Sequence, residues 1–587
     1  MRVQTKHVAQ AWPRCKGLPP PGDFLWHDHD HVTWTKSRAT NYNVTIRKER
    51  PEHCRDRLKF RAPLSSSQSG NTASSVVRTE ELRMCPYFVL VAGVAALLAF
   101  SCVVIRKARG SSSSKLPPSP PSRPLVGHLH LMGSLPHRSL RELHARYGTD
   151  GGLLFLRLGR RPTLVVSTAA AAADLYKNHD LAFASRVPSV PVDKLTYGCM
   201  NVSFAPYGDA WRRSKKMAVI HLLSPRRADS FAPVRAAEAA ALVAGARRAA
   251  EAGEAVELRE LLYAYSNSVV TRAAAGAAGA TAEKMKELMG NSAAFMSGLQ
   301  AEDVLPGAAA KMVRWATGLE KRIDVQVEAW DKFLSEIMAE HVEKKRDDGA
   351  EEDFLDVLLR LRKEGTAGLE LTDNRIKSII KDMIFAGTET SSITLEWVMA
   401  ELIGNPRVMA KLQDEVTRIA NGKPAIEEDD LRRMEYLKAV LKEVLRLHPP
   451  APLLVPHEST AAAVVQGYEI PAKTALFIND WAIARDPAAW GDAAEEFRPE
   501  RFLDGASATD VDVRGNDYQL LPFGAGRRIC PAINFALPVL EIAVASLVRH
   551  FDWELPAGTR LDMAETPGLV TPPLVPLRLV PKCRTPA

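Results

Sequence analysis

An uncharged apolar stretch interrupts the mixed pattern of hydrophobic and polar residues near residue 100. From Cys85 to Ile105 the chain has no charged residue, and Arg83 and Arg106 lie at its two ends. A helix needs about 20 apolar residues to cross a bilayer, and the apolar part of a cleaved signal peptide is usually shorter. The pattern predicts a single N-terminal transmembrane helix over residues 84–106. The basic residues that follow predict that the rest of the chain faces the cytoplasm.

Short alternating stretches and long helical stretches follow the apolar segment. Alternation at 153–158 and 163–167 predicts two strands, and the alanine-rich stretch 233–252 predicts a surface helix. A longer helix is predicted to begin at the capping residue Thr372 and to end before Asn405. Its buried face is predicted from apolar residues three and four apart: Ile376, Ile379, Ile380, Met383 and Ile384. The chain is therefore expected to be mostly helical with small β-sheets.

Two further segments surround the predicted transmembrane helix. Five of the eight residues at 117–124 are prolines, which favour an extended backbone, so we interpret 107–124 as a basic, proline-rich linker. Met84 stands directly before the apolar stretch. Residues 1–83 are therefore interpreted either as a spurious upstream extension of the reading frame or as a disordered tail.

Charge and cysteine content narrow the function classes. The net charge is +8, but residues 1–83 hold 15 Lys and Arg against 8 Asp and Glu, so the remaining residues carry only +1. Nearly neutral domains are poor candidates for nucleic-acid binding, and no nucleic-acid partner is expected. The seven cysteines are scattered without zinc-type spacing, which fits a reducing compartment.

The most specific chemistry lies in the segment 522–531, Pro-Phe-Gly-Ala-Gly-Arg-Arg-Ile-Cys-Pro. Its glycines permit a tight turn, and Pro531 suits the first turn of a helix. We therefore expect Cys530 at a helix N-terminus, where the dipole favours a thiolate, and a thiolate is an axial ligand for haem iron. A lone cysteine in a glycine turn would favour a structural role. Haem ligation is favoured by the joint spacing of four residues: Phe523, Gly526, Arg528 and Cys530.

This loop resembles the haem-binding loop of the cytochrome P-450 superfamily, and the resemblance covers about residues 116–582. It implies the cytochrome P-450 fold for a haem-thiolate catalytic domain at 125–587. It also implies that haem b is bound through Cys530, with Gly524 and Gly526 in the binding loop. The family usually has glycine where this chain has Ala532. A methyl group there is either tolerated or crowds the loop and lowers haem occupancy.

A carboxylate and a guanidinium lie at helical spacing in a predicted helix that ends at two prolines. Glu443 and Arg446 lie three residues apart, hence on one face of a helix that is predicted to close at 447–450. The family resemblance implies that these two residues and Arg501 form a buried charge network behind the haem. The role would be structural, because an unpaired buried charge is strongly destabilising.

A polar insertion interrupts the long predicted helix at 386–391. Thr390 falls on the buried face with Glu389 beside it, and Gly387 leaves room for a ligand. Without a haem, a threonine that bends the helix and a solvated glutamate would explain the pattern. The resemblance implies instead that Thr390 delivers protons to iron-bound oxygen and that Glu389 relays them from solvent.

Other residues match the haem frame of the family. The resemblance implies that the haem propionates contact four side chains: Trp211, Lys215, His457 and Arg528. The family commonly has arginine at the position of Lys215, and lysine keeps the charge but loses the bidentate fork. By family position, the substrate pocket is expected to include Ile384, Ala386, Gly387, Leu453, Leu454 and Val570.

The resemblance implies a monooxygenase anchored in the endoplasmic reticulum membrane, with the catalytic domain in the cytoplasm. It would use O2 and take electrons from NADPH through a separate NADPH-cytochrome P-450 reductase, since the chain has no dinucleotide-binding glycine motif. The expected partners are this reductase, membrane lipid and a small lipophilic substrate.

The substrate class rests on finer similarity. The stretches 133–137 and 183–186 are similar to plant indole and benzoxazinone hydroxylases of specialised metabolism, and flavonoid or terpenoid hydroxylases are the alternatives. Two other classes stay open: a haem-thiolate isomerase or dehydratase that works without a reductase, and a degenerate, non-catalytic haem binder.

Overall fold

The computed structural model describes residues 115–124, 126–276, 280–296, 305, 307–343, 352–423 and 425–584. The predicted extension at 1–83 and the predicted transmembrane helix at 84–106 lie outside the described residues, as does the first part of the linker. The described part of the linker, 115–124, contains no helix, and Arg123 forms an isolated β-bridge with Gly127.

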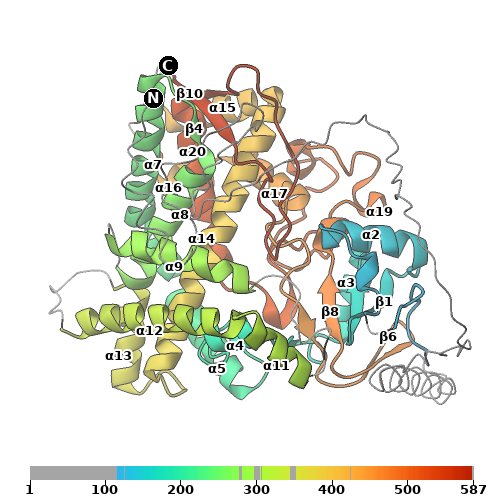
Figure 1. Ribbon diagram of the computed structural model, residues 1–587. Helices are drawn as coiled ribbons and strands as arrows, with labels where there is room; N and C mark the ends of the chain where they lie inside the picture. Colours follow the sequence, from blue (N-terminus) through green and yellow to red (C-terminus); the bar gives the residue numbers. More distant parts are fainter. Residues whose placement is uncertain are drawn as a thin grey trace, which may run out of the picture. The chain divides into compact units, whose positions relative to one another are not determined.

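Helices make up most of the described chain, as the hydrophobic pattern predicted (Figure 1). They are α2 (Pro136–Tyr147), α3 (Ala169–Asn178), α4 (Val190–Leu195), α5 (Asp209–Met217), α6 (Pro225–Ser230), α7 (Ala232–Ala252), α8 (Leu258–Ala275), α9 (Ala280–Met296), α11 (Gly307–Ala316), α12 (Leu319–Glu343), α13 (Phe354–Glu364), α14 (Asp373–Gly404), α15 (Pro406–Ala420), α16 (Glu428–Arg432), α17 (Glu435–Leu447), α18 (Asp480–Ile483), α19 (Pro487–Trp490) and α20 (Ile533–His550). Short 3-10 turns include η4 (Pro499–Phe502) and η5 (Gly526–Arg528).

The strands form small sheets. They are β1 (Leu153–Leu158), β2 (Arg161–Val166), β3 (Ser185–Arg186), β4 (Val256–Glu257), β5 (His457–Glu458), β6 (Ala463–Val465), β7 (Tyr468–Ile470), β8 (Ala475–Ile478), β9 (Phe551–Glu554) and β10 (Arg578–Cys583). The two strands predicted from alternation are confirmed as β1 and β2, which pair antiparallel. The largest sheet has the order β1-β2-β8-β5-β3, with only β2 and β8 parallel; the others are β4-β10-β9 and β6-β7.

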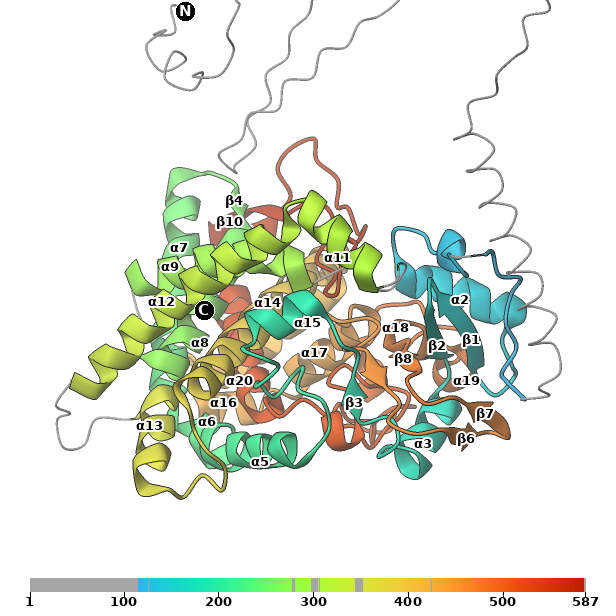
Figure 2. The same ribbon diagram turned by 60° about the horizontal axis from the view of Figure 1, so that its bottom comes forward.

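The sheet region and the helical region occupy opposite sides of the described domain. In both views β1, β8, α2 and α3 lie on one side and α7, α8, α9 and α12 on the other, with α14 running through the helical side (Figures 1 and 2). Strand β5 belongs to the sheet, and the segment before it reaches the cavity described below. The functional site is therefore assembled where helices and sheet meet.

Helix α14 confirms the long helix that the periodicity predicted. The side chain of Thr372 caps its first turn by accepting a hydrogen bond from the N–H of Arg375, 3.3 Å away. The predicted face is buried at each isoleucine, whereas Met383 is only half-buried because it borders a cavity. Helix α8 packs along α14 over much of its length.

The alanine-rich helix α7 is more deeply packed than predicted. One face is exposed, but Ala239, Leu242 and Ala246 are buried against neighbouring helices, among them α8 and α20. Small side chains let helix backbones approach one another closely, so the alanines serve packing as well as helix formation.

Among the described helices, α20 is the one whose length and apolar composition would suit a membrane span. Most of it is buried by the surrounding protein, and residues such as Val544 and Leu547 are fully enclosed in the core. Its hydrophobicity is explained by its place in that core, so α20 does not stand in for the predicted transmembrane helix.

Candidate functional site

A single cavity, which we call the thiol cavity, collects residues from distant parts of the sequence. Its lining includes Cys530 from the loop before α20, Thr390 from the middle of α14, and Trp211 from α5. Apolar groups from Val270, Phe354, Leu454 and Phe523, among others, form most of its wall. The cavity is therefore an apolar chamber with one thiol and a few polar groups.

The loop around Cys530 owes its shape to two glycines in the left-handed region. Gly524 and Gly526 have φ values of 68° and 61°. At Gly526 an added Cβ would also lie 2.5 Å from an Asp180 oxygen, so a larger residue does not fit. The N–H of Cys530 closes the loop by donating to the carbonyl oxygen of Phe523 at 2.9 Å. The thiol is thereby presented to the cavity from a constrained turn.

The electrostatics of Cys530 differ from the prediction. Helix α20 begins at Ile533, three residues later, with Ala532 as its N-cap. Burial raises the pKa of Cys530, although the Ala532 N–H and the charge of Lys215 act in the opposite direction. In the protein alone desolvation therefore opposes the thiolate that the helix N-terminus was expected to favour. A bound metal cation would supply the missing charge, since metal binding displaces the proton of a thiol.

Positive charge gathers at one edge of the thiol cavity. We call the set Arg186, Lys215, His457 and Arg528 the cation edge. All four line the cavity. Burial is the largest cause of the lowered pKa in each case. Neighbouring cations lower the pKa values of Lys215, His457 and Arg528 further, whereas the charge of Asp382 opposes the shift at Arg186. The values are about 10 for Arg186, about 8 for Lys215 and about 9 for Arg528, and that of His457 lies well below its usual range. An anionic ligand would relieve this repulsion.

Arg528 is held in place by carbonyl groups. Its guanidinium donates to the oxygens of Ala184 (2.7 Å), Val202 (3.3 Å) and Ala205 (2.5 Å) and lies 3.9 Å above the ring centre of Trp211. None of these partners is anionic. The arginine is therefore oriented without having its charge neutralised.

The other predicted members of the cation edge are anchored in the same way. The ammonium group of Lys215 donates to the carbonyl oxygens of Arg527 and, at 3.2 Å, Ile529. A ring nitrogen of His457 lies 2.9 Å from the carbonyl oxygen of Phe183. The structure thus brings the four predicted propionate-binding residues, including Trp211, to one side of one cavity.

Sequence reasoning missed Arg186. This arginine at the end of β3 is buried, and it donates to the carbonyl oxygens of Ser203 (2.9 Å) and Val455 (2.5 Å). Its segment was noticed only for its similarity to plant hydroxylases. The available signal was an arginine at the end of a very short strand, which is weak without the fold.

The α14 side of the thiol cavity carries the polar insertion. Thr390 lines the cavity, and its hydroxyl donates to the carbonyl oxygen of Ala386 at 2.8 Å. Glu389 is absent from the lining and lies partly buried toward Tyr263 of α8, where burial raises its pKa. A Cβ at Gly387 would lie 3.0 Å from Val270 of α8. Gly387 therefore permits close helix packing as well as lining the cavity.

Some of the expected substrate-pocket residues line a cavity, and two of them do not. Ala386, Gly387 and Leu454 line the thiol cavity, and Leu453 and Leu454 line an adjoining cavity next to the large sheet. Ile384 and Val570 do not line the thiol cavity. Ile384 is fully buried in the helical core, and Val570 packs against that core from the C-terminal segment. Helical rotation explains the first error, since Met383, one residue earlier, faces the cavity.

Asp382 is a second residue that sequence reasoning missed. It is the single carboxylate among the described residues of the cavity lining, and it accepts hydrogen bonds from the segment before α5. Burial raises its pKa, and the hydrogen bonds oppose that shift. The signal available in the sequence was a carboxylate directly before Met383, at the side of the predicted apolar face of α14.

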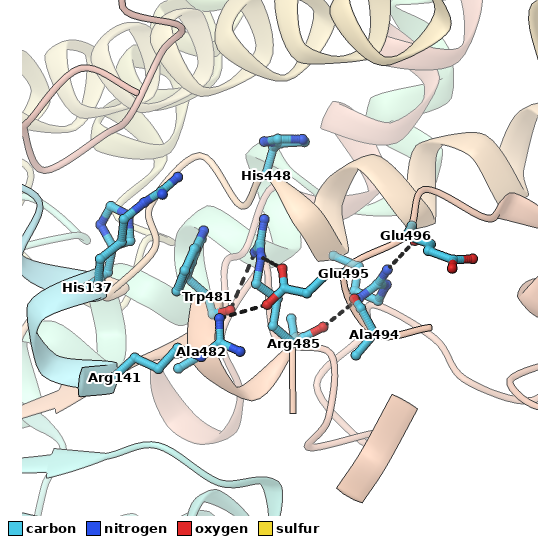
Figure 3. Close-up of polar contacts among 12 residues, drawn as sticks. His137, Arg141, His448, Trp481, Ala482, Arg485, Ala494, Glu495 and Glu496 are labelled. Atoms are coloured by element: carbon cyan, nitrogen blue, oxygen red, sulfur yellow. Dashed lines mark hydrogen bonds and ion pairs between the residues drawn. The ribbon is translucent and has the colours of Figure 1, made fainter. Parts of the chain in front are cut away.

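The charge network behind the loop assembles as the resemblance implied. Arg446 donates to Glu443 through two bonds of 2.8 Å, and Arg501 donates to the same carboxylate at 3.0 Å. Glu443 and Arg446 are fully buried. Arg446 also donates to the carbonyl oxygens of Ala494 (2.6 Å) and Glu496 (3.1 Å), two residues that are labelled in Figure 3. Each charge in this network has an opposite partner.

A neighbouring cluster in the same view links the network to the sheet region. Arg485 donates to Glu495 at 3.0 Å and stacks over Trp481, 4.3 Å from its ring centre (Figure 3). His137 lies across the same indole, with ring centres 5.0 Å apart. This cluster lies outside the thiol cavity and braces α2 against α18.

Comparisons with known proteins agree with this geometry. A family model described as Cytochrome P450 matches residues 117–577. Cytochrome P450 71A1 of Persea americana is 43% identical over 467 residues, covering 78% of this chain and 91% of that protein. Cytochrome P450 71A9 of Glycine max is 41% identical over 488 residues, which cover 80% of this chain and 94% of that protein.

Two further matches concern chemistry and fold. A protein named strychnine-11-hydroxylase from Strychnos nux-vomica is 39% identical over 490 residues, covering 82% of this chain and 94% of that protein. A solved structure of a zebra fish cytochrome P450 with progesterone superposes with a TM-score of 0.65 at 25% identity, over 76% of this chain and 99% of that one. The chain therefore belongs to the cytochrome P450 family, as a monooxygenase of the plant A-type.

Proposed function

We propose that this monooxygenase binds haem b through Cys530 and hydroxylates a small lipophilic specialised metabolite, with indole- or benzoxazinone-like compounds favoured. The observation that carries the proposal is the thiol cavity itself. It places one thiol in an apolar chamber whose edge bears Arg186, Lys215, His457 and Arg528. Flavonoids and terpenoids are the alternative substrates.

The residues present fit a haem group. A haem is a flat apolar ring with two carboxylates, and the cavity combines apolar walls with an edge formed by the cations Arg186, Lys215 and Arg528 and the imidazole of His457. The hydrogen-bond acceptors of these four side chains are backbone carbonyl oxygens. Thiolate-bound haem iron supplies the oxygen chemistry, by activating O2 for insertion of one atom into the substrate. The protein holds the ring, excludes water and delivers protons.

Proton delivery is assigned to α14. The hydroxyl of Thr390 lines the cavity and is within reach of a water held there. Burial raises the pKa of Glu389, which favours the protonated carboxyl that a relay needs. Glu389 would pass protons from the α8 side of the helix to Thr390.

Membrane anchorage completes the proposal. The predicted transmembrane helix at 84–106 would hold the enzyme in the endoplasmic reticulum membrane, with the catalytic domain cytoplasmic. Enzymes of this family take electrons from a redox partner, and we assign that role to an NADPH-cytochrome P-450 reductase. The hydroxylase name of one relative supports a plant metabolite as substrate.

A reduced-plus-carbon-monoxide spectrum tests the haem proposal. The wild-type protein should show the red-shifted Soret band of thiolate ligation, and Cys530→Ala should abolish it. Cys583→Ala is the matched control, because Cys583 is an exposed free cysteine on β10. A band that survives in Cys530→Ala, or fails in both variants, would reject the assignment.

Turnover experiments separate the remaining classes. Product formation that requires NADPH and reductase excludes a reductase-free isomerase or dehydratase, and a haem-loaded protein without turnover would indicate a degenerate binder. Substrate-induced spectral shifts across indole-derived, flavonoid and terpenoid compounds then identify the substrate class.

The proton-delivery role has its own test. Thr390→Ala should keep the haem but divert reducing equivalents into peroxide. Ser392→Ala is the control, because the Ser392 hydroxyl also donates to a backbone carbonyl oxygen within α14, that of Glu389 at 3.0 Å, and Ser392 does not line the cavity. Equal coupling in both variants would refute the role.

A further inference from the structure

A short segment between α4 and α5 has an unusual backbone. Residues 195–203, which we call the strap, include three consecutive residues with positive φ: Tyr197 (55°), Gly198 (80°) and Cys199 (52°). Residues other than glycine seldom adopt this region, so the conformation requires support from outside the strap. The strap ends at Val202 and Ser203, which line the thiol cavity.

Helix α14 supplies that support from two successive turns. The hydroxyl of Ser378 donates to the carbonyl oxygen of Thr196 at 2.7 Å, and the ammonium of Lys381 donates to that of Leu195 at 2.9 Å. Asp382, the next residue of α14, accepts a hydrogen bond from Asn201 near the other end of the strap. All three side chains are buried. The strap is therefore held at both ends by one helix.

Asp382 accepts three hydrogen bonds from the strap. One carboxylate oxygen receives the side-chain amide of Asn201 at 3.1 Å, and the other receives the N–H groups of Val202 and Ser203 at 3.0 Å each. The amide of Asn201 is oriented in turn, because its oxygen accepts from the N–H of Phe204 at 3.2 Å. Three donors converge on the carboxylate, an arrangement that suits its ionised form.

The same peptide groups carry the acceptors of the cation edge. A peptide group is planar, so fixing its N–H also fixes the direction of its C=O. The N–H of Ser203 bonded by Asp382 shares a peptide group with the carbonyl of Val202, which accepts from Trp211 (2.9 Å) and Arg528 (3.3 Å).

A parallel connection serves the other arginine. The N–H of Phe204, bonded by Asn201, shares a peptide group with the carbonyl of Ser203. That carbonyl accepts from Arg186 at 2.9 Å. Both guanidinium groups are thus oriented through peptide groups that depend on Asp382, directly or through Asn201.

We propose that Asp382 is a positioning residue for cofactor binding, which aims Arg528 and Arg186 through the strap. The inference rests on the proposed function, because the ligand that the arginines would receive is the pair of haem carboxylates. It makes α14 responsible for cofactor retention as well as for the substrate side of the cavity.

Asp382→Asn tests the inference with little change in shape. The amide must turn its NH2 toward at least one of the three donors, so the strap loses a bond and gains a repulsion. We expect haem transfer to an excess of apo-globin to become ~10-fold faster, in line with the loss of a buried charge-assisted hydrogen bond. Amide hydrogen exchange over 195–204 should also accelerate.

Asp373→Asn is the matched control. Asp373 lies in the first turn of the same helix and is exposed and paired with Arg362, so this variant should lose haem at the wild-type rate. The carbon monoxide spectrum of Asp382→Asn separates the two proposals. A red-shifted band together with haem loss at the wild-type rate would support the proposed function and reject the inference. Haem loss as slow as in Asp373→Asn would overturn the inference.

Two variants guard against a general loosening of the fold. Ser378→Ala frees only the Thr196 end of the strap, so exchange near 195–197 should rise while haem loss stays within about 2-fold of wild type. Asn201→Ala leaves α14 intact and should accelerate haem loss ~3-fold, even if Asp382→Asn does not fold. Equal haem loss from Ser378→Ala and Asn201→Ala would contradict the specific route through Val202 and Ser203.

Discussion

Two regions of this molecule bury arginines in opposite ways. In the network behind the Cys530 loop, Arg446 and Arg501 both bond to the carboxylate of Glu443. At the cation edge, Arg186 and Arg528 are also buried, yet their bonds go to backbone carbonyls. In the first region both arginines share one buried carboxylate, whereas in the second the arginines have no bonded carboxylate and the positive charge lies around a cavity.

The difference distinguishes a structural site from a binding site. Burying a charge is costly unless it is paired, so a protein gains nothing in its own stability from clustered unpaired cations. The lowered pKa values of Arg186 and Arg528, to about 10 and about 9, report that penalty. An anionic ligand would offset it on binding, which supports the proposal that the cation edge receives the carboxylates of the cofactor.

Removing the shared carboxylate of the network gives the largest expected effect. Glu443→Gln leaves two buried guanidinium groups without a counter-charge, so the free energy of unfolding should fall by about 3–5 kcal/mol. Denaturant unfolding of the apoprotein measures this change. Glu554→Gln, which breaks an exposed pair with Lys582, should change it by less than about 1 kcal/mol. Similar losses in the two variants would erase the contrast.

Acid titration examines another paired carboxylate. Burial opposes the shift, but bonds from His137 and Arg138 lower the pKa of Glu565 to about 2 from 4.5. A lowered carboxyl pKa contributes stability that is present above pH 4.5 and is lost as pH falls toward 2. The shift corresponds to about 3 kcal/mol. Unfolding from pH 6 to 2 should show this loss in wild type and a shallower slope in Glu565→Gln.

The loop of the cavity can be tested through steric fit. Gly505 and Gly526 both have positive φ, but an added Cβ meets nothing within 4 Å at Gly505 and Asp180 at 2.5 Å at Gly526. Gly505→Ala should therefore destabilise by about 1 kcal/mol through the backbone alone, and Gly526→Ala by at least about 2 kcal/mol. Gly526→Ala should also lose haem. Equal unfolding free energies would mean that Asp180 moves aside freely.

Arg186→Gln addresses the cation edge directly. The variant removes the donor of two carbonyl oxygens, but it also removes the cost of burying a charge. The free energy of unfolding of the apoprotein should therefore fall by only about 1 kcal/mol. Haem dissociation should nevertheless become roughly 10- to 100-fold faster, as expected for losing a charge-assisted bond. Arg141→Gln, on the exposed face of α2, is the control. A stability loss as large as that of Glu443→Gln would make Arg186 part of the structural framework.

The sequence was sufficient where local pattern decides the structure. Alternation located β1 and β2, and periodicity with a threonine cap located α14. The spacing of glycines and Cys530 marked the loop that borders the cavity. These features depend on residues close together in the sequence, so they can be predicted without knowing the fold.

Long-range geometry decided the remainder. Arg186, at the end of β3, and Asp382, in α14, belong to the site only because both form hydrogen bonds with the strap. These residues are far apart in the sequence, so no short motif predicts the contacts. Ile384 was placed on the wrong side because one helical step of 100° separates cavity from core. Burial raises the pKa of Cys530 against the effect of the local amide group, and burial is not visible in the sequence.

Ala532 gives the smallest effect and tests how strictly the loop follows its family. Its φ of −97° suits any L-residue, and its methyl group packs against the helical core, so glycine has no conformational advantage here. Ala532→Gly should lower the free energy of unfolding by about 0.5–1 kcal/mol, through lost packing and a more flexible unfolded chain, and leave the haem-to-protein ratio unchanged. Ala532 also lines the thiol cavity, so a higher haem content in Ala532→Gly would show that its methyl group crowds the cofactor there.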